Sequence, residues 1–173
     1  IDQIFTFFVF RKKRYEAYLK ALISTGFKMP EKNILISIGK PAQRPDFANA
    51  VELLIKMGYK IFATKGTQEW LEQEGVSNIQ QVFKPLVRRE PNALSSIQRG
   101  HIDMLINVPD SMDSQGVTDG FYMRRASVDK DIPVLTEVHT AILFVNALFF
   151  KFEREKEGKE FWGIESWQGY HEL

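Results

Sequence analysis

The residues best suited to bind a ligand lie in the segment Ile61–Thr67, where an apolar run leads into Lys65 and Gly66. This order predicts a strand, a tight turn at Gly66 and then a helix. Backbone N–H groups at the start of such a helix, together with the hydroxyls of Thr64 and Thr67, suit an anion such as phosphate or carboxylate. The alternative is that Thr67 only caps the helix and Gly66 only makes the turn, and the spacing favours neither interpretation.

Side chains of matching chemistry follow other apolar runs that read as strands. Lys84 comes after one such run, Asn107 lies near the end of another, and Lys40 and Arg44 lie in the loop after the first. The carboxyl ends of parallel strands share one edge, where open α/β sheets bind ligands. The sequence therefore predicts a cationic, hydrogen-bonding pocket for a small anion, formed by Thr64, Lys65, Gly66, Thr67, Lys84, Asn107, Lys40 and Arg44.

Catalytic chemistry is much less clearly indicated. The sequence has no cysteine, and its three histidines, His101, His139 and His171, lack the spacing of metal ligands. Neither the P-loop pattern nor the glycine pattern of dinucleotide-binding folds is present. Three aspartates near the predicted pocket rim have the chemistry of a general base, namely Asp110, Asp113 and Asp119. We expect none of them to act as one, and we expect no catalytic residue, metal or cofactor here.

Two adjacent arginines, Arg124 and Arg125, lie in a segment predicted to be helical. Neighbouring residues on a helix point about 100° apart, so at most one of the two can reach the pocket. The other is expected to meet solvent or a carboxylate. We favour a structural role for the pair.

The elements that must position these residues alternate along the chain. Short β-branched runs predict strands at Ile34–Ile38, Lys60–Thr64, Ile79–Phe83, Met104–Val108 and Val134–Thr136. Apolar spacing and stop signals predict intervening helices from Pro45 to Gly58, Thr67 to Glu74, Asn92 to Arg99, Phe121 to Asp131 and Glu137 to Phe150. The predicted fold class is therefore α/β, with a three-layer arrangement of a five-stranded, mostly parallel sheet and helices on both faces.

The flanks differ from this core. We expect residues 1–30 to form a lead-in segment with a helix at Arg14–Ser24, residues 31–151 the domain, and residues 152–173 a charged and aromatic tail. Lys and Arg number 23 against 22 Asp and Glu, so a net charge of +1 predicts no nucleic-acid partner. The apolar run Ile4–Phe10 is about half the ~20 residues that a membrane span needs, so no membrane partner is expected.

Several segments together resemble one known family. They include Asn33-Ile-Leu-Ile-Ser-Ile38, Phe62-Ala-Thr-Lys-Gly-Thr67, Pro91-Asn-Ala-Leu-Ser-Ser-Ile97, Ile102-Asp-Met-Leu-Ile-Asn-Val-Pro109 and Tyr122-Met-Arg-Arg-Ala-Ser-Val-Asp129. In this order they are similar to the C-terminal regulatory domain of the carbamoyl phosphate synthetase large subunit. The resemblance implies a methylglyoxal synthase-like fold. It also implies an allosteric module that binds an effector and biases synthetase domains of the same or a partner chain.

The resemblance also implies roles for individual residues. Thr64 and Thr67 would hold the phosphate or carboxylate of the effector, Lys84 matches a lysine of nucleotide-binding members, and Asn107 lies at the pocket floor. Lys84 favours a nucleotide such as UMP or IMP. Asp110 and Gly120 stand where acetylglutamate-binding members have asparagines, which argues against that effector. Gln43 stands where nucleotide-binding members have a lysine, with Lys40 and Arg44 as possible substitutes.

The resemblance implies that the parent enzyme makes carbamoyl phosphate for pyrimidine and arginine synthesis. It implies a cytoplasmic location, or the mitochondrial matrix for a eukaryotic ammonia-dependent member. Two alternatives stay open. One is a stand-alone lyase of the methylglyoxal synthase type, although the segments that would hold its aspartate base and histidine read Glu90-Pro-Asn-Ala-Leu-Ser and Thr118-Asp-Gly-Phe. The other is an interaction module without a ligand, using Phe144, Phe149 and Phe150 for an oligomer contact.

Overall fold

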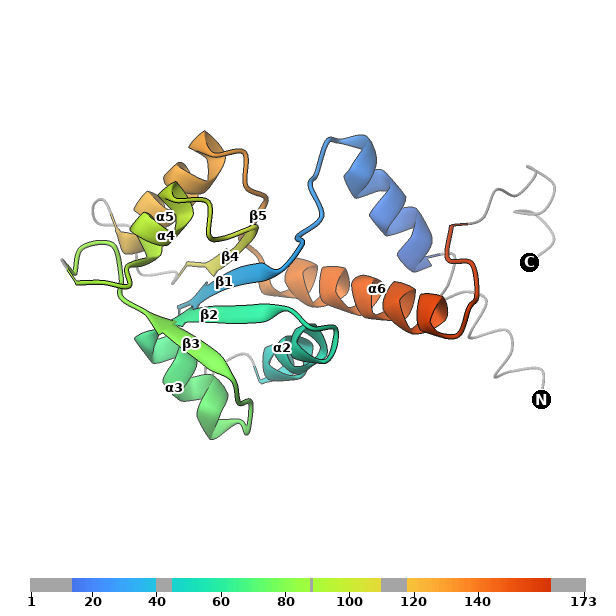
Figure 1. Ribbon diagram of the computed structural model, residues 1–173, viewed down its shortest axis with the longest axis horizontal. Helices are drawn as coiled ribbons and strands as arrows, with labels where there is room; N and C mark the ends of the chain where they lie inside the picture. The colour runs from blue at the N-terminus through green and yellow to red at the C-terminus, as the bar shows by residue number, and fades with distance from the viewer. Residues whose placement is uncertain (1–13, 40–44, 88, 110–117, 163–173) are drawn as a thin grey trace.

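A five-stranded, all-parallel sheet forms the centre of the computed structural model, which describes residues 14–39, 45–87, 89–109 and 118–162 (Figure 1). The strands are β1 (Asn33–Ile38), β2 (Lys60–Thr64), β3 (Ile79–Val82), β4 (Met104–Val108) and β5 (Val134–Leu135). Their order across the sheet is β3-β2-β1-β4-β5. All four pairings are parallel, which confirms the predicted fold class.

The helices cover both faces of this sheet. They are α2 (Asp46–Lys56), α3 (Lys65–Gln73), α4 (Ala93–Gln98), α5 (Asp119–Asp129) and α6 (Val138–Lys156). The chain travels outward from β1 to β3 and then returns to β4 on the other side of β1. Because parallel crossovers are right-handed, this reversal puts α2, α3 and α6 on one face and α4 and α5 on the other. Separate hydrophobic clusters under the two groups agree with this division.

β1 and β4, which lie next to each other in the sheet, carry apolar side chains on both faces, as strands covered by two helix layers must. Ile34, Ile36 and Ile38 of β1 face the cluster under α2 and α6, while Leu35 faces the one under α4 and α5. Ser37 is also on the α4–α5 side, and it is paired in register with Asn107 of β4. Near the carboxyl ends of β1 and β4, this apolar pattern is broken by the polar side chains of Ser37 and Asn107.

Several element boundaries differ from the sequence predictions. α3 begins at Lys65 rather than at Thr67, because Thr64 is already extended at the N-cap position, and Gly66 lies within the helix. β3 ends at Val82, because Phe83 forms an isolated bridge with Asn92 instead. α5 begins at Asp119, two residues before the predicted start, because the Thr118 hydroxyl accepts a hydrogen bond from the Phe121 amide.

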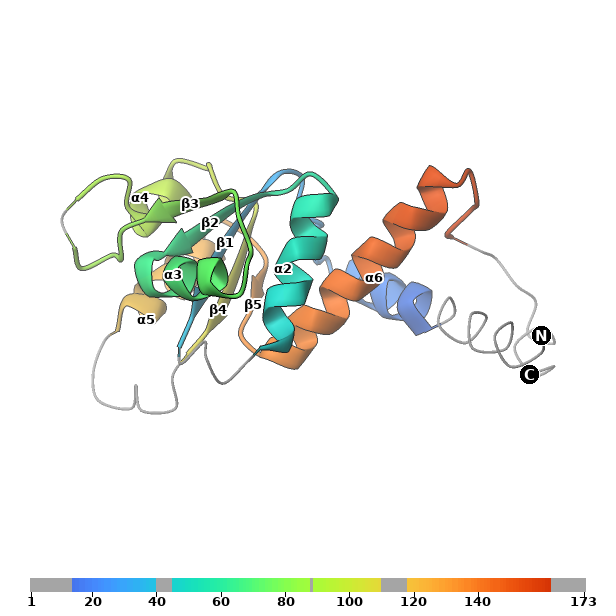
Figure 2. The same cartoon turned by 90° about the horizontal axis from the view of Figure 1, so that it is seen from below.

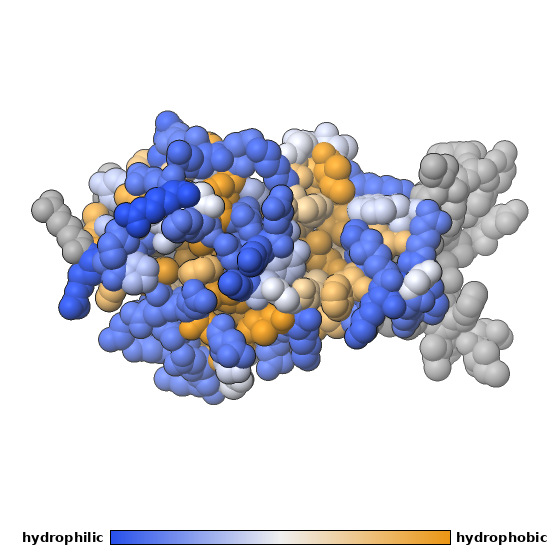
Figure 3. Space-filling view, in the orientation of Figure 1, coloured by the Kyte–Doolittle hydropathy of each residue, from blue (hydrophilic) through white to orange (hydrophobic). Residues whose placement is uncertain are grey.

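The predicted lead-in helix packs against α6. It spans residues 14–24, with Leu19 fully buried. Ring centroids lie 5.5 Å apart both for Tyr15 with Phe150 and for Phe27 with Phe144. Figure 2 shows α6 continuing past the sheet alongside this helix. Figure 3 shows apolar surface where α6 lies between α2 and residues 14–24.

α6 extends six residues beyond its predicted end at Phe150, to Lys156. The charged residues after Phe150 continue the helix, and Lys151 pairs with Glu155 at 2.6 Å across one turn. Beyond it, Phe161 is buried and lies 6.3 Å from the ring of Phe150. None of the helices in the described part of the chain combines the length and apolarity required to cross a membrane.

Glu137 caps the first turn of α6. Its carboxylate accepts hydrogen bonds from the amides of His139 at 3.0 Å and Thr140 at 2.7 Å. The amide of His139 is the largest of the causes that lower the pKa of Glu137 from 4.5 to about 2. A lowered pKa in the folded state means that this carboxylate stabilises the fold above about pH 4.5. That stabilisation is lost as the pH falls toward 2.

We therefore expect Glu137→Ala to lower the free energy of unfolding at pH 7 by about 1 kcal/mol, a typical value for a lost N-cap. The difference from wild type should shrink between about pH 5 and pH 2. Urea unfolding at several pH values measures both effects. Glu31→Ala, at an exposed position outside the helices, is the control and should change little. A deficit that stayed constant down to pH 2 would contradict the ionised cap.

Candidate functional site

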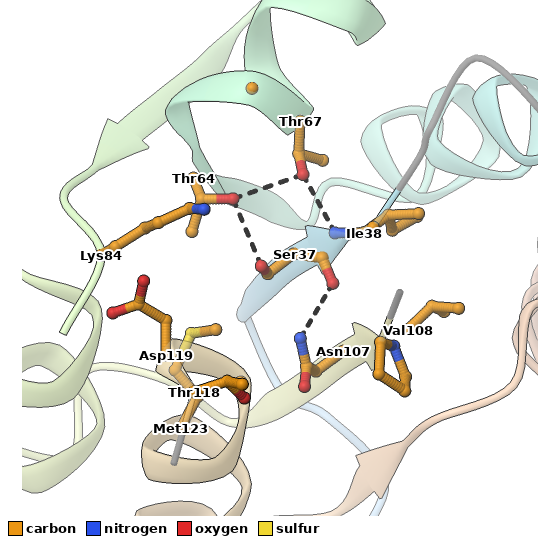
Figure 4. A pocket seen from close by; sticks show the side chains of 14 residues that line it. Ser37, Ile38, Thr64, Thr67, Lys84, Asn107, Val108, Thr118, Asp119 and Met123 are labelled. Atoms are coloured by element: carbon orange, nitrogen blue, oxygen red, sulfur yellow. Dashed lines mark hydrogen bonds between the residues drawn. The ribbon is translucent and has the colours of Figure 1, made fainter. Parts of the chain in front are cut away.

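A pocket of about 370 Å³ opens at the carboxyl ends of β1, β2 and β4 (Figure 4). It lies where the chain reverses its direction across the sheet, between β1 and β4, and open α/β sheets characteristically bind ligands at such a point. Its volume falls in the usual range for small-molecule sites, roughly 300–1,000 Å³. The lining residues are Ser37, Ile38, Gly39, Thr64, Gly66, Thr67, Lys84, Asn107, Val108, Pro109, Thr118, Asp119, Gly120 and Met123.

A row of polar side chains crosses the floor of the pocket from β2 to β4. Thr64 and Asn107 are only 2% and 3% exposed. The hydroxyl of Thr64 donates to that of Ser37 at 3.3 Å, and the Asn107 side-chain amide donates to the Ser37 carbonyl at 3.0 Å. Buried polar groups in such a row are useful to a ligand because they are fixed in place and shielded from bulk water.

Thr67 joins this row from the first turn of α3. Its hydroxyl accepts a hydrogen bond from the Ile38 amide at 3.0 Å and lies 3.3 Å from the Thr64 hydroxyl. The N-cap residue of α3 is Thr64, whose side chain makes no capping hydrogen bond, and Thr67 lies inside the helix, so the interpretation of Thr67 as the helix cap is wrong. The physical reason is that its hydroxyl is committed to the end of β1. Among the residues that the structure describes, no side chain caps the amides at the start of α3, beside the pocket.

Lys84 reaches the pocket from the loop after β3. Its side chain is exposed and runs toward Thr64 in Figure 4. Among the described residues, no carboxylate lies within ion-pair distance of its amine. The Asn92 side chain holds the loop by donating to the carbonyls of Lys84 at 3.0 Å and Val87 at 2.9 Å. The pocket rim therefore carries an unpaired cation on an anchored loop.

Arg124 supports Asn107 from behind, on the side of α5. It donates a hydrogen bond to the Asn107 side-chain oxygen, while Arg125 pairs with Asp129 at 3.0 Å on the outside of the helix. Only one arginine of the pair therefore points toward the site, as the helical spacing predicts. Gly120 allows this arrangement, because a Cβ there would lie 2.9 Å from the Arg124 guanidinium and 3.0 Å from the Asn107 oxygen.

The other predicted site residues divide into two groups. Lys65 lies at the start of α3, but its side chain is 3.6 Å from Glu69 and does not line the pocket. Lys40 and Arg44, like Asp110 and Asp113, fall outside the described residues. The described residues contain no group of His, Cys, Asp or Glu that could hold a metal ion.

Sequence reasoning missed some of the pocket. Ser37 was not singled out, although a serine within the buried apolar strand β1 was an available signal. Asp119 was considered as a general base, but the structure gives it a different contact. It lines the pocket and accepts the Leu86 amide at 2.8 Å, linking α5 to the Lys84 loop. Met123 also lines the pocket, and helical spacing alone did not separate it from core residues.

Comparison with known proteins gives a consistent picture. A family model described as "MGS-like domain" matches residues 46–136. The chain is 36% identical over 154 residues to "Multifunctional protein CAD" of Squalus acanthias, covering 80% of this chain and 7% of that protein. It is 38% identical over 138 residues to human "Carbamoyl-phosphate synthase (ammonia), mitochondrial", covering 78% of this chain and 9% of the relative. The chain thus spans less than a tenth of the length of these relatives.

A crystal structure of methylglyoxal synthase from Elizabethkingia anophelis NUHP1 has a similar fold. Its TM-score is 0.51 at 20% sequence identity, and the alignment covers 84% of this chain and 93% of that one. At this level of identity the similarity establishes the fold alone.

Gly120 and Gly66 offer a matched test of the packing at Asn107. We expect Gly120→Ala to lower the free energy of unfolding by about 1–3 kcal/mol, because the new methyl group forces the Arg124–Asn107 pair apart. Gly66→Ala is the control, since no atom lies within 4 Å of its added Cβ and alanine favours a helix. Equal stability of the two variants in urea unfolding would contradict the close approach at Gly120.

Proposed function

The chain belongs to the family of MGS-like domains, and from this premise we propose that it is the effector-binding regulatory domain of a carbamoyl-phosphate synthase. The parent enzyme would form carbamoyl phosphate from bicarbonate, ATP and ammonia or glutamine. The domain itself would bind a small phosphorylated or carboxylated effector at the carboxyl ends of its strands. The observation that carries the proposal is the pocket with buried hydroxyls on its floor and, at its rim, Lys84, which has no ion-pair partner among the described residues.

Each part of the pocket suits one part of an anionic ligand. The start of α3, at Lys65 and Gly66, presents backbone amides and the positive end of a helix dipole. The hydroxyls of Thr64 and Thr67 can donate to anionic oxygens without adding charge. Lys84 supplies the neutralising cation. In this proposal Lys40 and Arg44, in the loop after β1, complete the anion-binding rim.

The charges in the pocket favour a nucleotide over acetylglutamate. Lys84 is the cation that faces the described part of the pocket, while Asp119 contributes a carboxylate to the same lining. A ligand with two separated carboxylates would place one of them near Asp119, and like charges repel in a partly enclosed site. A nucleotide such as UMP or IMP carries one anionic end and hydroxyl donors elsewhere, which suits a pocket with opposite charges.

Regulation requires that the effector prefer one state of the whole enzyme, with a coupling that is typically about 1–3 kcal/mol. In the proposal, the helix at residues 14–24 joins this domain to the synthetase domains. The helix packs on α6 through the Tyr15–Phe150 contact, so its position is tied to the core of the domain. A change at the pocket could therefore reach the junction through packed elements.

A lyase reaction is the main enzymatic alternative. At the positions where a lyase would have its aspartate base and its histidine, the side chains of this protein accept hydrogen bonds that hold the local backbone. Glu90 is exposed and accepts the Asn92 amide at 3.0 Å and the Ser95 hydroxyl at 2.7 Å. Thr118 accepts the Phe121 amide at 3.2 Å as the cap of α5. General-base catalysis contributes roughly 10²–10⁴-fold and needs a positioned acceptor. We therefore expect no turnover of dihydroxyacetone phosphate.

A thermal-shift titration tests ligand binding directly. The ligands are UMP, IMP, UTP, phosphoribosyl pyrophosphate, acetylglutamate and inorganic phosphate. A ligand at 100 times its dissociation constant should add about 2.7 kcal/mol of stability. We expect a nucleotide to raise the melting temperature of the wild type, and the Thr64→Val variant to lose this shift. Thr25→Val, at an exposed position far from Thr64 in the sequence, should keep it. No shift with any ligand would refute the effector pocket.

Lys84 allows a second, electrostatic test. We expect Lys84→Gln to weaken binding of the nucleotide about tenfold, because a charge-assisted hydrogen bond is lost. Lys60→Gln is the matched control, since Lys60 is an exposed lysine at the opposite, amino end of β2. Calorimetry at low and high salt should show that the wild-type advantage shrinks as salt is added. Equal affinities for the two variants would refute the role of Lys84.

A further inference from the structure

The loop after β3 brings Lys84 to the pocket with little apolar packing of its own. Its described residues are 84–87 and 89–91, of which Pro85 is partly buried and the others are exposed. A loop with few buried apolar contacts opens at low cost unless hydrogen bonds hold it. The position of the Lys84 backbone at the pocket rim therefore depends on the polar contacts of the loop.

Asn92 holds one side of this loop. It is 8% exposed, and its side-chain oxygen accepts the Leu94 amide at 2.8 Å as the cap of α4. This contact turns the side-chain nitrogen toward the loop, where it donates to the carbonyls of Lys84 at 3.0 Å and Val87 at 2.9 Å. Serine and aspartate cap helices as well as asparagine does, but only asparagine can also donate two hydrogen bonds. The loop thus accounts for an asparagine at this cap.

Asp119 holds the other side of the loop. It is the first residue of α5, and its carboxylate accepts the Leu86 amide at 2.8 Å. Leu86 lies between the two residues whose carbonyls Asn92 binds, so both edges of the same short stretch are fixed. Figure 4 shows Asp119 on the same side of the pocket as Lys84. The starts of α4 and α5 therefore hold the Lys84 loop between them.

We propose that Asn92 and Asp119 are positioning residues, which hold the loop so that Lys84 faces an anion bound in the pocket. This inference rests on the proposed function and adds to it the side chains that act through Lys84. A lysine whose backbone is already fixed loses less conformational freedom on binding. Without these contacts the exposed loop would have to be ordered each time an anion binds, which lowers the affinity.

The contact at Asp119 also ties the loop to the pocket lining on α5. Gly120 and Met123 of this helix line the pocket, whereas Leu86 is not among the described lining residues. A nucleotide that fixes the first turn of α5 also fixes Asp119 and, through it, the Leu86 amide. We therefore expect bound UMP to slow hydrogen exchange at Leu86 without touching this residue.

Hydrogen exchange of the Leu86 amide, followed by NMR on the whole chain, tests the contact with α5 in the absence of any ligand. Asp119→Ala should speed the exchange at least about tenfold, whereas Asp119→Asn keeps an acceptor oxygen and should stay within about threefold of wild type. Both variants remove the carboxylate charge, so their difference reports the hydrogen bond. Equal exchange rates in Asp119→Ala and the wild type would overturn the role of Asp119.

Asn92→Ser tests the other side of the loop, by calorimetry with UMP. Serine still caps α4 and changes no charge, but its side chain is too short to reach both loop carbonyls. We expect the affinity for UMP to fall about fivefold. In the Lys84→Gln background the same substitution should change the affinity less than about twofold, because the loop no longer carries the cation that Asn92 positions. A general distortion of the pocket would lower the affinity equally in both backgrounds.

Asn78→Ser is the matched control. Asn78 is exposed and immediately precedes the amino end of β3, opposite the end that leads into the Lys84 loop. Its φ of 64° favours asparagine over serine, so this variant should lose stability. It should nevertheless bind UMP as the wild type does. Circular dichroism checks that each variant folds, and the Asp119→Ala and Asp119→Asn pair enters the same calorimetric comparison if Asn92→Ser does not fold.

The outcomes separate this inference from the proposed function. Unchanged UMP affinity in Asn92→Ser, or an equal loss in the Lys84→Gln background, would overturn the positioning role and leave the effector pocket intact. A wild-type chain that binds neither UMP nor IMP would overturn the proposed nucleotide site and, with it, any role of Asn92 and Asp119 in binding. The exchange rate of the Leu86 amide would still decide whether Asp119 holds the loop.

Discussion

The amide of Ile38 donates its hydrogen bond to the hydroxyl of Thr67 at 3.0 Å, and the geometry of the pocket depends on this contact. Buried backbone donors must be paired. β2 has already turned into α3 at this level, so a side chain of the helix takes the place of a neighbouring strand. The first turn of α3 is thereby fixed against the end of β1. Gly66 and Thr67 of this turn consequently line the pocket at the ends of the strands.

The pocket floor is complete without a ligand, yet its contacts are easily exchanged. The Thr64 hydroxyl lies 3.3 Å from the hydroxyl of Ser37 and 3.3 Å from that of Thr67, longer than the roughly 2.7–2.8 Å typical of hydroxyl hydrogen bonds. Hydroxyl hydrogens can rotate toward a new acceptor without moving the heavy atoms. In the proposed function, an anion in the pocket would therefore gain hydrogen bonds while the buried scaffold, held by Asn107 and the Ile38 amide, stays in place.

Much of this architecture could be predicted from the sequence, because it depends on local patterns. β2 and β4 have their predicted bounds, since β-branched and apolar runs with clear ends mark them. The role of Thr67 at the start of α3 could not be predicted, because its hydroxyl is used by the Ile38 amide of β1, which is distant in sequence. The aromatic residues of the alternative oligomer contact also depend on a packing contact that is distant in sequence. Phe144 is fully buried against Phe27, which only the packing of residues 14–24 on α6 could reveal.

Gly120 constrains how the pocket can diverge among related sequences. Any side chain at this position would meet both Asn107 and Arg124, which approach its backbone from β4 and from the next turn of α5. A mutation that introduced a new ligand-binding group at position 120 would disrupt this pair before it could bind anything. If the pocket binds an effector as proposed, a change of effector through this corner of the site requires coupled substitutions at Gly120 and at Asn107 or Arg124. The order in which such mutations can accumulate is correspondingly restricted.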